Sequence, residues 1–160
     1  MTEPMHHELP TDSDIDLRQP AQRRELRRPW PVLGAISAGG ALGAAARYGL
    51  LVAFPTAPPG FPWTIFGVNV AGCLLIGALM VLVTDVWPHR RLLRPFLGVG
   101  VLGGFTTFST YSVEIQGLVD ARALGTAVVY LAGTLVAALA ATWSGLGLAR
   151  RAVRRSRAAQ

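Results

Sequence analysis

The sequence predicts an all-α membrane protein with four transmembrane helices, the third of which is broken near its middle. Of the 160 residues, 51% are hydrophobic, 15% are charged and 18 are glycine, which is too apolar and glycine-rich for an ordinary soluble domain. Four apolar stretches reach the roughly 20 residues that a helix needs to cross a hydrocarbon core. One of these stretches carries a glycine pair and a run of hydroxyl residues, GGFTTFSTYS, at its centre. Such a run does not suit a continuous lipid-facing helix, so a broken helix is expected there.

The four predicted spans follow one another closely and form one compact transmembrane domain, residues 31–148. The spans are residues 31–54, 62–87, 92–116 and 124–148, separated by short segments rich in proline or charge. Residues 1–30 are a polar N-terminal tail that is predicted to be disordered, and residues 149–160 are an arginine-rich C-terminal tail. The N-terminal tail is not expected to be a signal peptide, because the apolar run after it is too long and lacks a small-residue cleavage site.

Arginine is distributed unequally between the two sides of the predicted bundle. Four spans place both termini and the loop between the second and third spans on the same side. That side holds most of the arginines: Arg18, Arg23, Arg24, Arg27, Arg28, Arg90, Arg91, Arg94, Arg150, Arg151, Arg154, Arg155 and Arg157. Only Arg47 and Arg122 lie on or toward the other side. The positive-inside rule therefore predicts a multi-pass protein of the cell inner membrane with both termini in the cytoplasm.

The location of the same arginines indicates whether the partner is nucleic acid or lipid. The formal net charge is +6, and all 15 basic residues are arginine. They lie in flanks and short connections and do not follow one face of an amphipathic helix, which argues against nucleic acid. The lipid headgroup layer is the better partner. The lone cysteine, Cys73, supplies neither a disulfide framework nor a metal-binding spacing.

Small residues recur every four positions along the first span and indicate close helix packing. Ala35, Gly39 and Gly43 lie on one stripe of the helix, and the stripe ends at Arg47. The glycines are interpreted as packing residues, whereas Arg47 either snorkels to the interface or has a buried structural partner. In the second span, Asn69 is either a clamp between helices or part of a polar pathway, and the clamp is favoured on this span alone.

The hydroxyl-rich segment of the third span predicts a break near residues 103–106. Irregular backbone at membrane depth is tolerated only where it is buried in protein or lines a watered cavity. A break leaves free carbonyls on the first half-helix and free N–H groups on the second, which suit a cation and an anion respectively. After the break, Phe108 and Tyr111 share one face, and Ser109 and Ser112 share the adjoining face. These groups offer protons and positive ring edges without full charge, which favours a pathway for a small anion over a kink that serves packing alone.

Three motifs resemble those of the CrcB/Fluc fluoride channels. They are GGALGAAARY at residues 39–48, NVAGC at residues 69–73 and GGFTTFSTYSVE at residues 103–114, and the resemblance extends over all four spans. It implies antiparallel dimers with two pores and a central sodium ion bound by backbone carbonyls at the break. It also implies a fluoride path lined by aromatic edges, an asparagine and hydroxyl groups.

The resemblance assigns roles to residues by their position in these motifs. It implies that Asn69 is the pore amide, that the carbonyls of Gly103 and Thr106 bind the sodium ion, and that Phe108 and Tyr111 contact fluoride. Further residues would follow along or beside the path: Ser109, Ser112, Glu114, Tyr130 and Thr134. Residues with an expected structural role are Gly39, Gly43, Arg47 and Glu114.

Three features depart from the family pattern. Tyr111 stands where the family usually has phenylalanine, and its phenol could donate to fluoride or narrow the path. The hydroxyl row of the fourth helix usually carries serine where this chain has Thr134 or Ala138. The arginine bias favours a single orientation in the membrane, whereas an antiparallel homodimer needs both orientations. It therefore favours an oppositely oriented paralogue as the partner, with a homodimer as the alternative.

The predicted function is a fluoride-selective channel that exports cytoplasmic fluoride passively across the cell membrane. The glycine-rich segment GVGVLGG lacks the Gly-Lys-Ser/Thr of a phosphate loop, and no other energy-coupling motif is visible. One alternative is a proton-coupled small-anion exporter with Glu114 as the titrating group, and another is a packing subunit of a heterodimeric channel. An intramembrane serine protease is disfavoured because His6, His7 and His89 lie outside the spans. The chain is therefore not expected to be an enzyme.

Overall fold

The fold is all-helical throughout the residues that the structure describes. The chain is represented by a computed structural model that describes residues 29–158. Four helical spans in this range are long and apolar enough to cross a membrane, which confirms the predicted fold class. The polar tail predicted over residues 1–30 lies outside the described residues except for its last two positions.

The first two spans are continuous α-helices whose bounds are close to the predicted ones. Helix α2 covers Trp30–Ala53 and helix α3 covers Trp63–Asp85. The proline-rich loop between them is tied to the start of α3, because the Thr64 hydroxyl donates to the Phe54 carbonyl at 2.5 Å.

The third span is assembled from three helical pieces. Arg94–Leu102 form a π-helix, η1, Gly103–Phe105 form a single turn, α4, and Ser109–Asp120 form α5. The three residues between α4 and α5 are not helical, and the first of them, Thr106, is extended with φ −74° and ψ 155°. The interruption thus begins at the C-terminal end of the segment 103–106. The π winding of η1, in which the Gly103 N–H reaches the carbonyls of Gly98 and Gly100, is not indicated by the sequence.

Helix α6 covers Leu124–Ala158 and extends well beyond the predicted fourth span. Residues 149–158, which the sequence analysis assigns to the arginine-rich C-terminal tail, continue this helix. The physical reason is composition, because alanine and arginine are strong helix formers and no glycine or proline follows Gly147.

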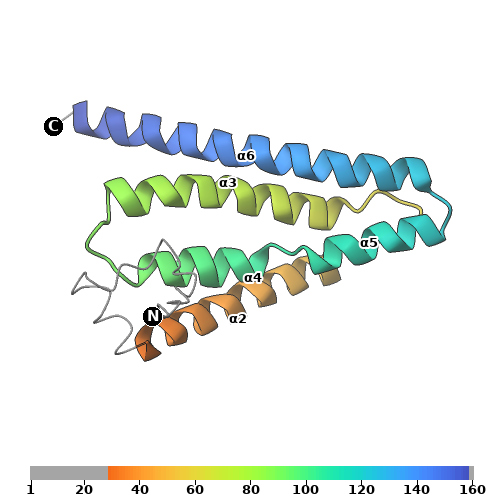
Figure 1. Cartoon of the computed structure of the whole chain (residues 1–160), viewed down its shortest axis with the longest axis horizontal. Helices are drawn as coiled ribbons and strands as arrows, with labels where there is room; N and C mark the ends of the chain where they lie inside the picture. The colour runs from red at the N-terminus through yellow and green to blue at the C-terminus, as the bar shows by residue number, and fades with distance from the viewer. Residues whose placement is uncertain (1–28, 159–160) are drawn as a thin grey trace, which may run out of the picture. The chain divides into compact units, whose positions relative to one another are not determined.

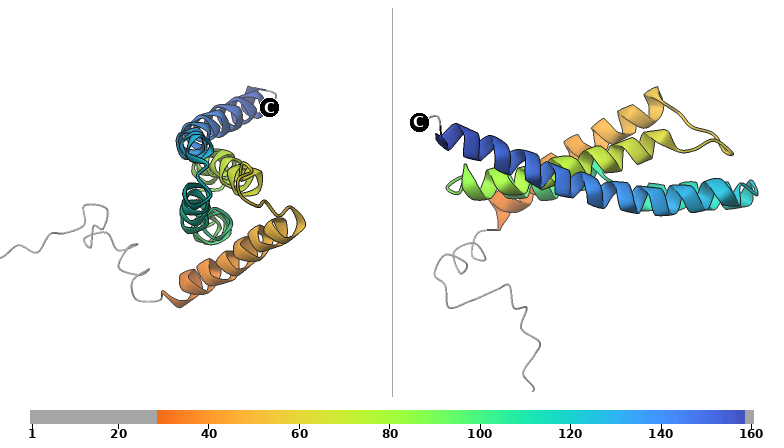
Figure 2. Two further views of the ribbon diagram at one scale, coloured as in Figure 1. Left: turned by 90° about the vertical axis from the view of Figure 1, so that its right-hand side faces the viewer. Right: turned by 90° about the horizontal axis from the view of Figure 1, so that it is seen from above.

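The helices of the described region lie lengthwise beside one another. Figure 1 shows α3 between α6 and the third span, with α3 and α6 running in the same direction. The views in Figure 2 show α2 inclined to the other helices, and its glycines contact the third span at η1 and α4. The break between α4 and α5 therefore lies beside α3.

Glycine backbones make the closest contacts between helices. A Cβ atom on Gly39 or Gly43 of α2 would overlap a backbone carbonyl of η1, and one on Gly104 of α4 would overlap the Gly40 carbonyl. Side chains at these positions would force α2 away from the third span, which gives the small-residue stripe its packing role. Two further glycines make the same kind of contact between α3 and α6: Gly77 and Gly145.

Candidate functional site

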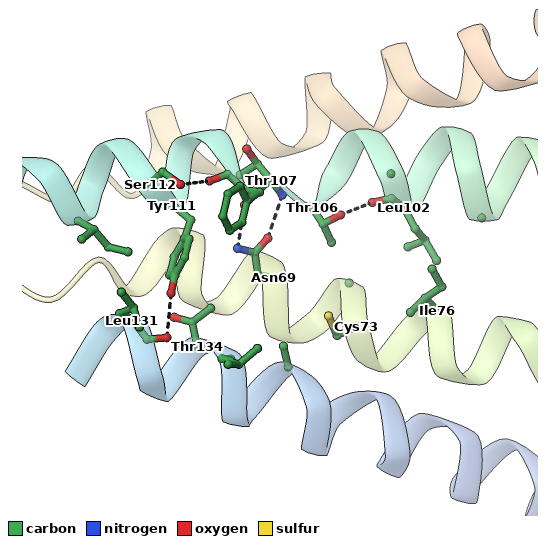
Figure 3. A pocket seen from close by; sticks show the side chains of 17 residues that line it. Asn69, Cys73, Ile76, Leu102, Thr106, Thr107, Tyr111, Ser112, Leu131 and Thr134 are labelled. Carbon is green, nitrogen blue, oxygen red and sulfur yellow. Dashed lines mark hydrogen bonds between the residues drawn. The ribbon is translucent and has the colours of Figure 1, made fainter. Parts of the chain in front are cut away.

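A cavity of about 850 Å³ lies between α3, the broken third span and α6. The wall from α3 consists of Asn69, Gly72, Cys73 and Ile76. The wall from the third span consists of Gly98, Leu102, Gly103, Thr106, Thr107, Phe108, Tyr111, Ser112 and Ile115. The wall from α6 consists of Leu131, Thr134, Leu135 and Ala138. Figure 3 shows these side chains around the space, with the break along one wall.

The amide nitrogen and the amide oxygen of Asn69, on α3, both form hydrogen bonds with the backbone of the break. Its Nδ2 donates to the Thr107 carbonyl at 3.0 Å, and its Oδ1 accepts the Thr107 N–H at 2.9 Å (Figure 3). The side chain thus takes the place of the helical bonds that the break has removed. A primary amide has two N–H donors, so one proton of Asn69 is left for another acceptor in the cavity. The clamp and the pathway roles considered for Asn69 are therefore compatible.

Two backbone carbonyls at the break lose the donors that a continuous helix would supply. In an α-helix the Thr107 N–H would bond Gly103, but here it bonds Asn69. Likewise the Thr110 N–H would bond Thr106, but here it bonds the Thr107 hydroxyl oxygen at 3.2 Å. Gly103 and Thr106 both line the cavity, and they are the two residues whose carbonyls were expected to bind sodium.

Thr107 is the residue at this site that the sequence analysis did not assign. It bonds Asn69 through its backbone, and its hydroxyl oxygen accepts an N–H in the first turn of α5. The local signal was available, because threonine just upstream of a new helix often accepts a backbone N–H of its first turn, as Thr107 does from Thr110. The contact with Asn69 was not predictable locally, since the two residues are 38 positions apart.

Phe108, directly before α5, and Tyr111 in α5 lie side by side, and the tyrosine phenol points across to α6. The ring centroids of Phe108 and Tyr111 are 5.8 Å apart at an interplanar angle of 44°. The Tyr111 hydroxyl donates to the Leu131 carbonyl at 2.8 Å (Figure 3). Its proton is therefore used between helices, and the ring alone faces the cavity. Phe108 is 80% exposed, so this chain by itself does not cover it.

Thr134 places an unpaired hydroxyl in the wall of the cavity. The residue is only 6% exposed, and its Oγ1 has no hydrogen-bond partner among the described residues. Threonine on a helix commonly bonds back to a carbonyl of the preceding turn, as Thr142 does to Ala138 at 3.0 Å. A buried hydroxyl without a partner is costly, which marks Thr134 as a group that a ligand in the cavity could satisfy.

Three of the residues predicted along or beside the fluoride path do not line the cavity. Tyr130 is fully buried, packs against Tyr111 with ring centroids 5.1 Å apart, and donates its hydroxyl proton to Glu114 Oε2 at 2.5 Å. The bonded pair of Tyr130 and Glu114 lies in the packing between α5 and α6, where Tyr130 also contacts Leu118. Ser109 is exposed, and its hydroxyl lies 3.2 Å from that of Thr107.

Ser112 and Arg47 are both bonded to backbone carbonyls of the third span. The Ser112 hydroxyl donates to the Phe108 carbonyl at 2.9 Å, although the residue lines the cavity. Arg47 is half-buried, and its Nε donates to the Gly104 carbonyl at 3.3 Å. Arg47 thus places a positive group at the carbonyl end of the first half-helix, where it is favourable.

The lining of the cavity carries no Asp, Glu, Lys, Arg or His side chain. Its polar groups are one amide, hydroxyl groups and backbone carbonyls at the break, surrounded by apolar side chains. Among residues 29–158, no three His, Cys, Asp or Glu side chains gather as a metal site. The arrangement can offer neutral donors to an anion and, on the side of the break, carbonyl oxygens to a hard cation.

Comparison with known proteins places these features in a family. A family model described as "CrcB-like protein, Camphor Resistance (CrcB)" matches residues 34–146. "Fluoride-specific ion channel FluC 2" of Streptomyces avermitilis is 53% identical over 139 residues, which cover 84% of this chain and 85% of that protein. "Fluoride-specific ion channel FluC 1" of Streptomyces coelicolor is 52% identical over 132 residues, covering 82% and 86%. "Fluoride-specific ion channel FluC 2" of Nocardia farcinica is 57% identical over 119 residues, covering 74% and 85%.

The matched region includes every residue that lines the cavity and the whole of the broken third span. It also includes the α2 glycines that contact this span. The match extends over most of the chain, and so the chain belongs to the CrcB-like protein family.

Proposed function

We propose that the chain is a fluoride-selective channel that exports cytoplasmic fluoride passively, through pores formed in an antiparallel dimer. The observation that carries this proposal is the cavity at the helix break, whose polar groups are neutral donors and whose lining has no charged side chain. Relatives that share more than half of their aligned residues with this chain are named fluoride-specific ion channels. Neutral donors hold an anion weakly enough for it to leave again, as conduction requires.

In this proposal, the donors to fluoride come from three sides of the cavity. Asn69 provides the amide proton that is not bonded to Thr107, and Thr134 provides its unpaired hydroxyl. Phe108 and Tyr111 present ring edges, which carry partial positive charge. Ser112 takes part only by releasing its bond to the Phe108 carbonyl.

A sodium ion fits the two carbonyls at the break. Gly103 and Thr106 have carbonyl oxygens whose usual helical donors are engaged elsewhere, and such oxygens suit a hard cation. One chain offers two of these carbonyls, and the twofold axis of an antiparallel dimer would bring two more. When bound, the ion would supply a fixed positive charge that holds the broken helices of the two chains together.

Export needs no coupling to an energy source. In an acidic medium, fluoride crosses the membrane as neutral HF. The HF ionises in the less acidic cytoplasm, where the anion is trapped. An interior-negative membrane potential drives an anion outward with about 2.3 kcal/mol per 100 mV. A selective pore is therefore sufficient for resistance to fluoride, and the proposal assigns the chain no enzymatic activity.

Fluoride efflux from liposomes tests the channel directly. The purified full-length chain is reconstituted, and fluoride release is followed with a fluoride electrode beside chloride release under the same gradient. We expect fluoride efflux that greatly exceeds chloride efflux. If neither this chain alone nor this chain with an oppositely oriented paralogue releases fluoride, the channel assignment is wrong.

The same assay separates the channel from a proton-coupled exporter. Glu114 lies outside the 850 Å³ cavity and accepts a hydrogen bond from Tyr130. Glutamine keeps an oxygen acceptor for that hydroxyl, so Glu114→Gln should retain most of the fluoride flux in a channel. An exporter that titrates Glu114 would lose its transport. Asn69→Asp is the matched variant, because it places a negative charge in the cavity and should block the flux.

The location and the partner belong to the same proposal. The distribution of arginine supports insertion in the cell inner membrane with both termini in the cytoplasm. It also supports pairing with an oppositely oriented paralogue rather than with a second copy of this chain. If the chain is a packing subunit of such a pair, substitutions of Phe108 and Tyr111 would leave the flux intact.

A further inference from the structure

One end of the bundle carries exposed arginines that take no part in the cavity. They come from the loop between α3 and η1, from the start of η1 and from the last turns of α6. We term this set the arginine end: Arg90, Arg91, Arg94, Arg150, Arg151, Arg154, Arg155 and Arg157. Among residues 29–158 the carboxylates are those of Asp85, Glu114 and Asp120, and only Asp85 belongs to this end of the bundle. The arginine end therefore has a large positive charge that the described part of the chain does not neutralise.

The end of α6 is held against the end of α3. Arg157 donates through Nη2 to the Asp85 carbonyl at 3.0 Å, directly before the loop that carries Arg90 and Arg91. Ala149 is buried and Val153 is half-buried, so one side of the last turns still packs on the bundle. The arginines of the loop and those of α6 consequently form one surface.

The arginines of α6 share one side of that helix. At about 100° per residue, Arg150, Arg154 and Arg157 fall on a single stripe, and Arg151 and Arg155 lie on the adjoining stripe. The small residues that pack on α3 lie on the opposite side, beginning with Gly145. The guanidinium groups on these two stripes therefore face outward, apart from that of Arg157, which bonds back to α3.

The length of α6 places this face at the depth of the lipid headgroups. At about 1.5 Å per residue, the 35 residues of α6 extend roughly 50 Å, whereas a hydrocarbon core is about 30 Å thick. The helix continues past the end of α3, as Figure 1 shows. Guanidinium groups bind phosphate oxygens in a bidentate manner, and a cluster of them beside a membrane attracts anionic lipid.

We propose that the arginine end is a binding surface for anionic phospholipid headgroups, whose phosphates lie against the arginine face of α6 and the loop between α3 and η1. The surface binds lipid after the protein has inserted and folded, beyond any role of the same charges in setting the orientation. It does not depend on the ion that the cavity conducts.

Lipid retention by the purified full-length protein tests this proposal. The protein in detergent is mixed with equal amounts of phosphatidylglycerol and phosphatidylcholine, and bound lipids are counted by native mass spectrometry. We expect preferential retention of phosphatidylglycerol. Each arginine near an anionic surface contributes about fivefold in affinity, so the variant R150Q/R151Q/R154Q/R155Q should bind phosphatidylglycerol at least about tenfold more weakly. Equal retention of both lipids by the unaltered protein would overturn the proposal.

Three controls locate the effect and separate charge from folding. Arg122 lies in the loop between α5 and α6, away from the arginine end, so R122Q should leave phosphatidylglycerol retention unchanged; a loss as large as that of the fourfold variant would overturn the proposed location. The variant R150K/R151K/R154K/R155K keeps the charge but loses the bidentate guanidinium groups, so it should retain phosphatidylglycerol better than the glutamine variant and less well than the unaltered protein; retention no better than that of the glutamine variant would contradict binding by charge. With the unaltered protein, about 1 M salt shortens the Debye length to about 3 Å and should abolish the preference. A preference that survives the salt would contradict binding by charge.

Discussion

The polar residues of the cavity differ in whether their hydrogen-bonding groups are already used. Asn69 has one amide proton committed to the Thr107 carbonyl, and Tyr111 has its only proton committed to the Leu131 carbonyl. Thr134, in contrast, has a hydroxyl without a partner among the described residues. A group with an unused proton can serve an anion at no cost to the fold, so these residues should respond differently to substitution.

Thr134→Val should lower fluoride flux without weakening the fold. Valine has nearly the same shape but removes a buried hydroxyl that has no protein partner, so thermal stability in detergent should stay the same or rise. Loss of one hydrogen bond to an anion, about 1.5 kcal/mol, corresponds to roughly tenfold slower efflux from liposomes. Thr142→Val is the control, because that hydroxyl bonds the Ala138 carbonyl of its own helix and should leave flux unchanged. Equal flux in both variants would show that Thr134 is not part of the fluoride path.

Tyr111→Phe should have the opposite effect: it should weaken the fold while fluoride flux continues. The phenol proton holds α5 to α6 through the Leu131 carbonyl, so its removal should reduce the free energy of unfolding by about 1 kcal/mol. Fluoride flux should continue, because the aromatic ring that faces the cavity is retained. The matched control is Tyr48→Phe, since Tyr48 is 69% exposed on α2. A collapse of flux with unchanged stability would mean that the phenol serves the ion.

The sequence predicts most of the polar side chains of the cavity and few of their hydrogen bonds. Hydroxyl groups around a glycine pair indicate a polar break, and the structure brings seven of the predicted residues to one cavity: Asn69, Gly103, Thr106, Phe108, Tyr111, Ser112 and Thr134. Tyr130 instead lies in the packing between helices, bonded to a residue 16 positions earlier. Such pairings depend on the register between α5 and α6, which the residues of a single span do not encode.

At the level of elements, the close contact between α2 and the third span depends on individual glycines. A Cβ on Gly43 would overlap the Val101 carbonyl, whereas a Cβ on Gly40, three positions earlier, would meet nothing within 4 Å. The two glycines have the same intrinsic effect on the helix, so a comparison between them isolates the packing contact.

Gly43→Ala should therefore destabilise the protein while Gly40→Ala should not. Because the Gly43 contact is with backbone on both sides, the helices must move apart, at a cost of about 1–3 kcal/mol. Gly40→Ala should be neutral or slightly stabilising through its helix propensity. Thermal unfolding in detergent, followed by circular dichroism, measures both. Equal melting temperatures for the two variants would show that α2 can shift without penalty.

The spans were more predictable than their internal winding and their ends. Length and apolar composition determine which segments can cross a membrane, and the bounds of α2 and α3 agree closely with the prediction. Helix α6 continues past the predicted fourth span because hydropathy falls at the arginines, although helix propensity does not. The pattern of residues in η1 does not indicate its π winding, and η1 also lies in close backbone contact with α2.

For the whole molecule, the distribution of charge bears on how two chains can pair. The arginine end lies on the side of the bundle where α3 and α6 finish, and Arg122 lies in the loop just before α6. An antiparallel pair of identical chains would place one arginine end on each side of the membrane, against the positive-inside rule. An oppositely oriented paralogue avoids this conflict.

Fusion reporters at the C-terminus should therefore find a single orientation. Green fluorescent protein becomes fluorescent only if it stays in the cytoplasm, because it does not fluoresce when it is exported unfolded. Alkaline phosphatase is active only outside the cytoplasm. We expect a fluorescent fusion and an inactive phosphatase fusion in a bacterial host. Substitution of the arginines of the arginine end by glutamine should make both reporters active. Equal activity of both reporters in the unaltered chain would indicate dual orientation and favour the homodimer.

The unbroken course of α6 has a practical consequence for imaging. A chain of 160 residues that is mostly embedded in lipid offers few features for the alignment of single particles in electron microscopy. Because α6 is helical to Ala158 and Arg157 bonds it to the end of α3, a helix-to-helix fusion at this point would hold a soluble marker protein in a fixed direction. The helix that forms one wall of the cavity would then also connect the channel rigidly to the marker used for particle alignment.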